Sequence, residues 1–177
     1  MAPLPWTPRP PKPNRPGNPC VPLTLVPGRT GTDGGPAGRR QVGGTPAPAT
    51  VLDPATQAVA HRWPQFLPDG EHFVYLDRNA SYGPGREAAV TLGRLGSLEP
   101  VARLLDVATN AVYADGHLLY ASDGVLVARP LDPKRHRLEG EAHTIVGDLL
   151  FNRRFTYGVF SASDRGLLAF LTGRQSD

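Results

Sequence analysis

Cysteine is almost missing from this chain of 177 residues, in which Cys20 stands alone. A single cysteine excludes a disulfide within the chain and a zinc site built from cysteines. No apolar run approaches the roughly 18 residues of a membrane-spanning helix. The first thirty residues, which prolines interrupt throughout, contain no apolar core of a signal peptide. We therefore expect no membrane segment in this chain, and the missing signal peptide favours the cytoplasm.

Proline and basic charge are concentrated in residues 1–40. This segment holds eleven of the twenty prolines and has a net charge of +5, whereas residues 41–177 have −2, which gives the total of +3. Prolines at this density remove backbone donors and prevent helix or sheet, so we expect a disordered Pro/Gly/Arg-rich arm. Two alternatives are a PxxP ligand of adaptor domains and an out-of-frame reading of GC-rich DNA. The nearly neutral remainder predicts no nucleic-acid binding.

Three segments after residue 40 repeat one pattern, in which a turn with aspartate and glycine is followed by a short apolar run. The turn glycines are 46 and 50 residues apart, which is close to the length of one propeller blade. Because Asp-Gly accepts the positive dihedral angles of a tight hairpin, each segment predicts an inner pair of strands. The segments are 66–76, 112–120 and 160–170, with turn residues Asp69, Gly70, Asp115, Gly116, Asp164 and Gly166.

A second pattern lies between these turns and predicts an outer pair of strands in residues 41–53, 93–106 and 129–148. The apolar runs 73–76 and 118–120 do not alternate with polar residues, which is typical of strands covered on both faces. Residues 87–98 are the only helix candidate. They contain Gly93 and Gly96 and are therefore expected to form strand and turn.

These patterns predict an all-β fold, a partial β-propeller of about three four-stranded blades behind the disordered arm. The expected division has residues 41–58 as outer strands of a preceding blade and residues 59–106 and 107–148 as blades. Residues 149–177 would start a further blade.

Residues 62–75, with the sequence RWPQFLPDGEHFVY, resemble the blade signature of TolB-type, WD-repeat-like propellers. Their succession with 103–106, 110–113, 116–120 and 160–163 resembles most closely the C-terminal propeller region of bacterial eukaryotic-like serine/threonine protein kinases. The resemblance covers residues 41–177. It implies a module that accompanies a kinase domain, and in kinases of this type the module lies on the extracytoplasmic side of the membrane.

Motifs of catalysis are missing. The sequence has no Gly-rich phosphate loop, no catalytic loop with Asp and Asn, and no Asp-Phe-Gly. Its two lysines, Lys12 and Lys134, do not lie in apolar strands, and no Gly-x-Ser-x-Gly occurs. The five histidines show no close pair with ligand spacing. We therefore expect no enzyme activity, no metal site and no cofactor.

Polar residues just before the Asp-Gly turns are candidates for lining a central channel, because the inner strand of each blade faces it. The alternative is that they satisfy backbone groups at turns and strand ends. Trp63 is expected to pack between blades. The candidates for ligand binding are His61, Arg62, Gln65, Asn110, Asn152 and Arg153.

About three blades cannot close a ring, since closed propellers need four to eight. The uncovered apolar faces predict a protein or peptide partner, blades supplied by another chain, or self-association; truncation of a larger propeller is the favoured explanation. The functional hypothesis is a non-catalytic binding or sensing module. The alternatives are a propeller enzyme with a metal held by Asn110, Asn152 and His61, and a structural fragment without activity of its own.

Overall fold

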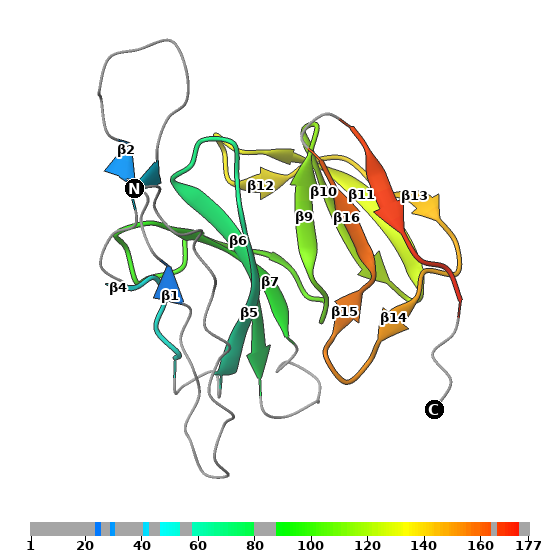
Figure 1. Cartoon of the computed structure of the whole chain (residues 1–177), viewed down its shortest axis with the longest axis horizontal. Coiled ribbons are helices and arrows are strands. Elements are labelled where there is room, and N and C mark those ends of the chain that lie inside the picture. The colour runs from blue at the N-terminus through cyan, green and yellow to red at the C-terminus, as the bar shows by residue number, and fades with distance from the viewer. Residues whose placement is uncertain are drawn as a thin grey trace, which may run out of the picture.

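The chain is all-β, as its sequence predicts (Figure 1). The computed structural model describes residues 47–53, 58–79, 88–163 and 166–173, together with the backbone of the short strands β1 (Thr24–Leu25), β2 (Arg29–Thr30) and β3 (Gln41–Val42). These residues contain seventeen strands and no helix. They accordingly include no helix that is long and apolar enough to cross a membrane.

The first sheet is an antiparallel meander of four strands in chain order. The predicted strand within residues 87–98 is confirmed as the third of them. Gly93 in that strand is required by packing, because a Cβ atom there would lie 2.7 Å from the Phe73 ring. The four strands are β5 (Ala58–Phe66), β6 (His72–Asn79), β7 (Ala89–Arg94) and β8 (Ala102–Leu105).

The second sheet repeats this arrangement. Its strands β9 (Ala111–Ala114), β10 (His117–Ser122), β11 (Val125–Asp132) and β13 (His143–Val146) pair antiparallel in chain order. The short strand β12 (Arg137–Leu138) pairs with the far end of β11.

Two hairpins follow the second sheet. They consist of β14 (Phe151–Asn152) with β15 (Tyr157–Gly158), and of β16 (Phe160–Ala162) with β17 (Leu168–Phe170). Backbone hydrogen bonds join them, since Leu171 N donates to Val159 O at 3.0 Å and Leu150 N donates to Leu171 O at 2.8 Å.

The strands before the first sheet pair among themselves. β3 pairs with β2, and β4 (Ala47–Pro48) pairs with β1, so β3 and β4 do not form a hairpin with each other. The assignment of residues 41–58 to the outer strands of a preceding blade stays a prediction.

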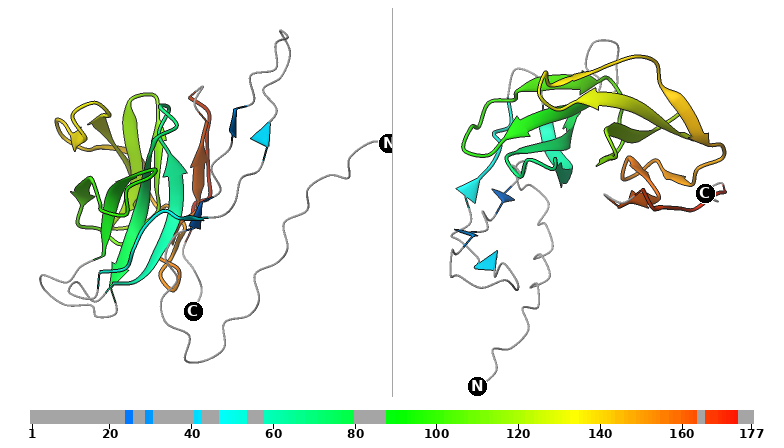
Figure 2. Two further views of the ribbon diagram at one scale, coloured as in Figure 1. Left: turned by 90° about the vertical axis from the view of Figure 1, so that its left-hand side faces the viewer. Right: turned by 90° about the horizontal axis from the view of Figure 1, so that it is seen from above.

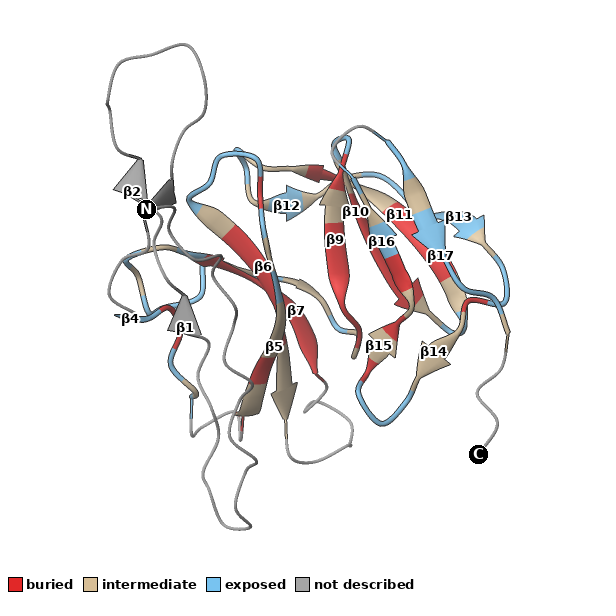
Figure 3. Cartoon of the chain, in the orientation of Figure 1, coloured by how far each residue is buried: buried red, intermediate tan, exposed pale blue. Residues whose placement is uncertain are grey.

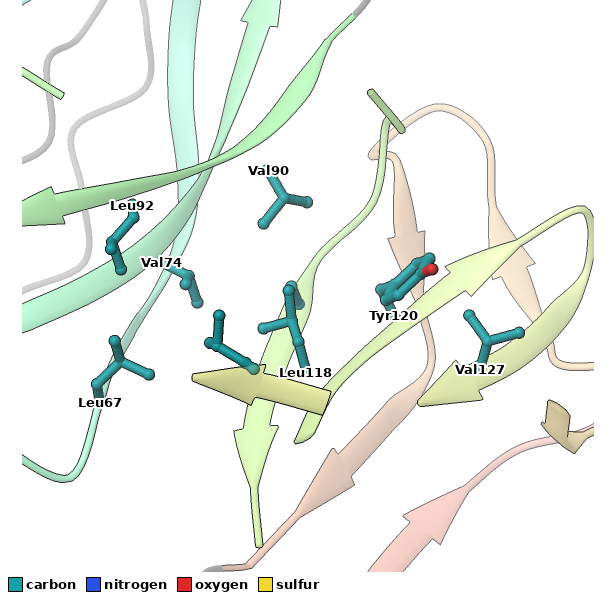
Figure 4. Close-up of a cluster of buried hydrophobic side chains, with 9 residues drawn as sticks. Leu67, Val74, Val90, Leu92, Leu118, Tyr120 and Val127 are labelled. Atoms are coloured by element: carbon teal, nitrogen blue, oxygen red, sulfur yellow. The ribbon is translucent and has the colours of Figure 1, made fainter. Parts of the chain in front are cut away.

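The central strand β10 of the second sheet is buried on both faces. Along β10, Leu118 and Tyr120 belong to the apolar cluster shared with the first sheet (Figure 4). Leu119 and Ala121 belong to a second cluster, shared with Leu149 and Phe160 of the C-terminal segment. All four are buried (Figure 3), which is the physical reason for the missing alternation in the sequence.

The first strand of the second sheet lies next to strands of both neighbouring units. β9 contacts β5 of the first sheet and β16 of the C-terminal hairpins. Seen from above, the chain turns from the first sheet through the second to the hairpins (Figure 2). The other face of the first sheet is buried as well, where Phe73 and Tyr75 form a cluster with Ala49.

Replacing Leu118 by alanine should destabilise the protein by about 2–5 kcal/mol, because the side chain is fully buried between the two sheets. Leu98→Ala is the matched control: this side chain is 48% exposed, and its loss should change stability by no more than about 0.5 kcal/mol. Urea denaturation followed by circular dichroism measures both. Equal effects of the two substitutions would contradict the packing of the sheets.

Candidate functional site

A groove with a volume of about 1260 Å³ lies between the second sheet and the C-terminal hairpins. It is lined by residues 107–108, 121–125, 148–149, 151, 153–154 and 173. Apolar side chains including Val107, Val125 and Phe151 share it with charged ones. The charged residues are exposed, and they are Asp123, Asp148, Arg153 and Arg154.

A two-residue turn places Asp123 in the groove. Ser122 and Val125 are paired at the end of β10 and β11, and Asp123 and Gly124 between them have φ values of 50° and 79°. Consecutive positive φ angles define the type I′ hairpin that Asp-Gly favours. Sequence reasoning did not single out this fourth Asp-Gly pair, although it carries the same signal as the predicted turns.

Both signs of charge in the groove are available to a ligand. Among the described residues, none of the four charged side chains forms an ion pair. The Arg154 guanidinium lies 5.7 Å from the centre of the Phe155 ring, so an aromatic surface adjoins the arginine pair. This combination suits a ligand that carries backbone-type hydrogen-bonding groups, a charge and an apolar side chain.

Of the predicted ligand-binding residues, Arg153 lines this groove and Asn152 shapes the turn that carries it. Asn152 Oδ1 accepts a hydrogen bond from Phe155 N at 3.1 Å. This is the local backbone role that the alternative interpretation of the sequence gave to such residues.

Asn110 is buried and joins the second sheet to the β14–β15 hairpin. Its Nδ2 donates to Gly158 O at 3.1 Å, and its Oδ1 accepts from Gly158 N at 2.7 Å. Gly158 is closely surrounded, since a Cβ atom there would lie 3.0 Å from both Ala121 Cβ and Leu149 Cδ2. The amide thus satisfies both backbone groups of a residue that has no room for a side chain.

His61 lies beside Tyr75, on the face of the first sheet that is turned away from the second sheet. Its Nδ1 is 2.8 Å from Thr50 Oγ1, its Nε2 is 3.4 Å from Asp77 Oδ1, and its ring centre is 4.7 Å from that of Tyr75. Burial, and secondly the Asp77 carboxylate, raise the pKa of Tyr75. His61, Asn110 and Asn152, which the metal-enzyme hypothesis grouped, therefore have three separate sets of partners.

Arg62 and Gln65 are half-buried on β5, on either side of a bulge. Trp63 in this bulge has a φ of 55°, which is rare for an aromatic residue. Its Nε1 donates to Phe155 O at 3.3 Å, and its ring centre lies 4.7 Å from that of Tyr157. Trp63 therefore packs between units, and the assignment of Arg62, Gln65 and the other candidates to ligand binding stays a prediction.

The three turn glycines lie between β5 and β6, between β9 and β10, and between β16 and β17. Gly70, Gly116 and Gly166 have φ values of 68°, 77° and 79°, and Asp115 has 45°. Asp164 lies outside the described residues.

Asp69 organises the first of these turns. Its Oδ1 accepts from Glu71 N and His72 N at 2.9 Å, and its Oδ2 is 2.7 Å from His72 Nδ1. Slight burial acts to raise the pKa of Asp69, but the hydrogen bonds from His72 and Glu71 outweigh it, so that the pKa is lowered.

Two histidines that are far apart in the sequence, His72 and His136, lie side by side in the structure. The ring centres of His72 and His136 are 4.6 Å apart, although the two residues belong to different sheets. Among the described residues no group of three or more His, Cys, Asp or Glu side chains is arranged to hold a metal ion.

Comparisons with known proteins add no relative: no protein-family model, curated protein or solved structure matches the chain.

Asn110→Ala should destabilise the protein by about 1–3 kcal/mol, because Gly158 N and O would lose buried partners. Asn152→Ala is the control, since its single bond is exposed and should be worth less. Denaturant unfolding gives the stabilities, and hydrogen exchange at the Gly158 amide should accelerate only in the Asn110 variant. Unchanged exchange at Gly158 would contradict the proposed link.

Proposed function

We propose that this chain is a non-catalytic binding module built as a partial β-propeller of about three blades. The observation that carries the proposal is the second sheet, which is buried on one face by the first sheet and on the other by the C-terminal segment. Face-to-face stacking of four-stranded meanders with adjacent inner strands is the packing of propeller blades. The contacts of β9 with β5 and β16 support this assignment.

The relation to the accessory region of bacterial serine/threonine kinase-like proteins rests on the sequence resemblance. The charged side chains of the groove are exposed, and among the described residues they form no ion pair with one another, so they can bind the polar groups of a ligand. Binding of a ligand or partner is the function that these exposed charges support best.

The C-terminal hairpin offers an apolar surface for a partner. Leu167 is 76% exposed and Leu171 is 55% exposed, while Leu168 packs toward the second sheet. Phe170, which pairs with Phe160, is also partly exposed. Burying exposed apolar area of this kind in a contact stabilises that contact by about 25 cal/mol per Å². We infer that another β-sheet packs here, supplied by a second copy or by further blades.

The groove is the second binding surface. Arg153 and Arg154 attract an acidic side chain, Asp123 and Asp148 accept backbone N–H groups, and Val107, Val125 and Phe151 contact an apolar side chain. The chemistry that fits all three is an extended peptide segment with an acidic and an apolar residue.

Replacing Leu167 and Leu171 by aspartate should weaken self-association, because two carboxylates would have to be desolvated in the contact. Leu98→Asp changes a comparably exposed leucine in the β7–β8 connection and should have no effect. Sedimentation velocity over a concentration series measures the association. A protein that stays monomeric throughout, or variants that associate equally, would contradict docking of a second copy.

Peptides selected from a displayed random library should bind the groove. Removing both charges in Arg153→Ser/Arg154→Ser should lower the affinity of the recovered peptides about tenfold or more, which is about 1.4 kcal/mol. Lys134→Ser/Arg135→Ser removes two exposed cations outside the groove and is the matched control. Fluorescence anisotropy measures the affinities, and equal losses in both double variants would contradict the groove as the binding site.

A further inference from the structure

The histidine pair lies where the first and second sheets meet. His72 begins β6, directly after the first Asp-Gly turn, and its side chain is only 12% exposed. His136 belongs to the turn between β11 and β12 of the second sheet. The two ring centres are 4.6 Å apart and the ring planes are inclined by 44°.

Asp69 orients the ring of His72. Its carboxylate oxygen Oδ2 lies 2.7 Å from Nδ1. A carboxylate only accepts hydrogen bonds, so Nδ1 is the donor of this pair, and Nε2 is the nitrogen of a neutral imidazole that can coordinate an ion. A carboxylate that orients the second nitrogen of an imidazole is the usual outer partner of a metal-binding histidine. Asp69 is itself held by two backbone N–H groups, those of Glu71 and His72.

The separation of the rings matches a shared ion. Two imidazoles on one ion, with metal–nitrogen bonds of about 2.0–2.1 Å, have ring centres about 4.5 Å apart when the bonds are at right angles and about 5.2 Å apart at the tetrahedral angle. The observed 4.6 Å falls in this interval. We propose that His72 and His136 together bind a divalent transition-metal ion of the zinc, nickel and copper class.

The surroundings of the pair are compatible with a cation. The arginines of the β11–β12 turn are already paired, Arg135 with Asp132 and with Glu139 at 3.6 Å, and Arg137 with Glu139 at 3.3 Å. Asp132 Oδ1 also accepts from Lys134 N and Arg135 N, which orders the turn that presents His136.

The donor set decides the class of ion. Imidazole suits zinc, nickel and copper, whereas calcium and magnesium prefer oxygen ligands. Because no third protein ligand joins the pair among the described residues, water or an incoming ligand completes the coordination. The ion would link a turn of the first sheet to a turn of the second, and binding to the folded state alone would raise stability.

Isothermal titration with Zn²⁺ or Ni²⁺ tests the site on the full chain. The wild type should bind one ion, and His136→Asn and His72→Asn should each lose affinity about tenfold or more. Asparagine tolerates the φ of 56° at position 136, and at position 72 its amide can still donate to Asp69. His143→Asn, on the exposed strand β13, is the control and should bind like the wild type.

Thermal unfolding with and without Zn²⁺ gives an independent readout, in which the ion should raise the Tm of the wild type and of His143→Asn only. If His72→Asn does not fold, the comparison of His136→Asn with the wild type tests the proposal by itself. Binding that persists in both single variants and in the double variant would overturn the proposal, and so would the absence of saturable binding by the wild type, which would leave the rings as a packing contact.

Discussion

The central strand β10 of the second sheet has no polar face, and the rest of the structure depends on covering both of its sides. Leu118 and Leu119 point to opposite faces of β10, and both are buried. Exposing either face would leave leucine, valine and alanine side chains in water at a cost of about 25 cal/mol per Å². The first sheet and the C-terminal hairpins are therefore needed on either side, and a stack of units follows.

Polar side chains then fix how the units of the stack meet. Asn110 satisfies both backbone groups of Gly158, and Trp63 reaches from β5 to the β14–β15 turn. These groups connect surfaces that apolar packing brings together without specifying their register. The sequence placed Asn110 among the residues expected to line a ligand channel, and in the structure its amide makes such a connection. A polar residue before a turn can therefore hold the scaffold together.

The two proposed binding surfaces suit partners of different chemistry. The C-terminal hairpin presents Leu167 and Leu171, which only another apolar surface covers favourably. The groove presents both signs of charge beside apolar side chains and suits a segment that brings hydrogen-bonding groups of its own. The histidine pair belongs to neither surface. It lies between the first two sheets, so an ion bound there would act on the stack rather than on a partner.

Local chemistry alone determined the all-β character of the chain and three of its hairpins. The Asp-Gly turns predicted the inner hairpins, the glycines in residues 87–98 excluded a helix, and the unbroken apolar runs predicted strands covered on both faces. Such features depend on neighbours within a few residues. They can therefore be read from one sequence without knowing what packs against what.

Only the tertiary structure decided which distant residues meet. The sequence showed no pair of histidines with ligand spacing, because His72 and His136 are far apart along the chain, yet stacking of the first two sheets brings their rings to 4.6 Å. His61 and Asn110 were grouped in one channel, but they have different partners, Thr50 and Gly158. A side chain's partner depends on the face of the sheet and on the unit that covers it, and both are properties of long-range packing rather than of local sequence.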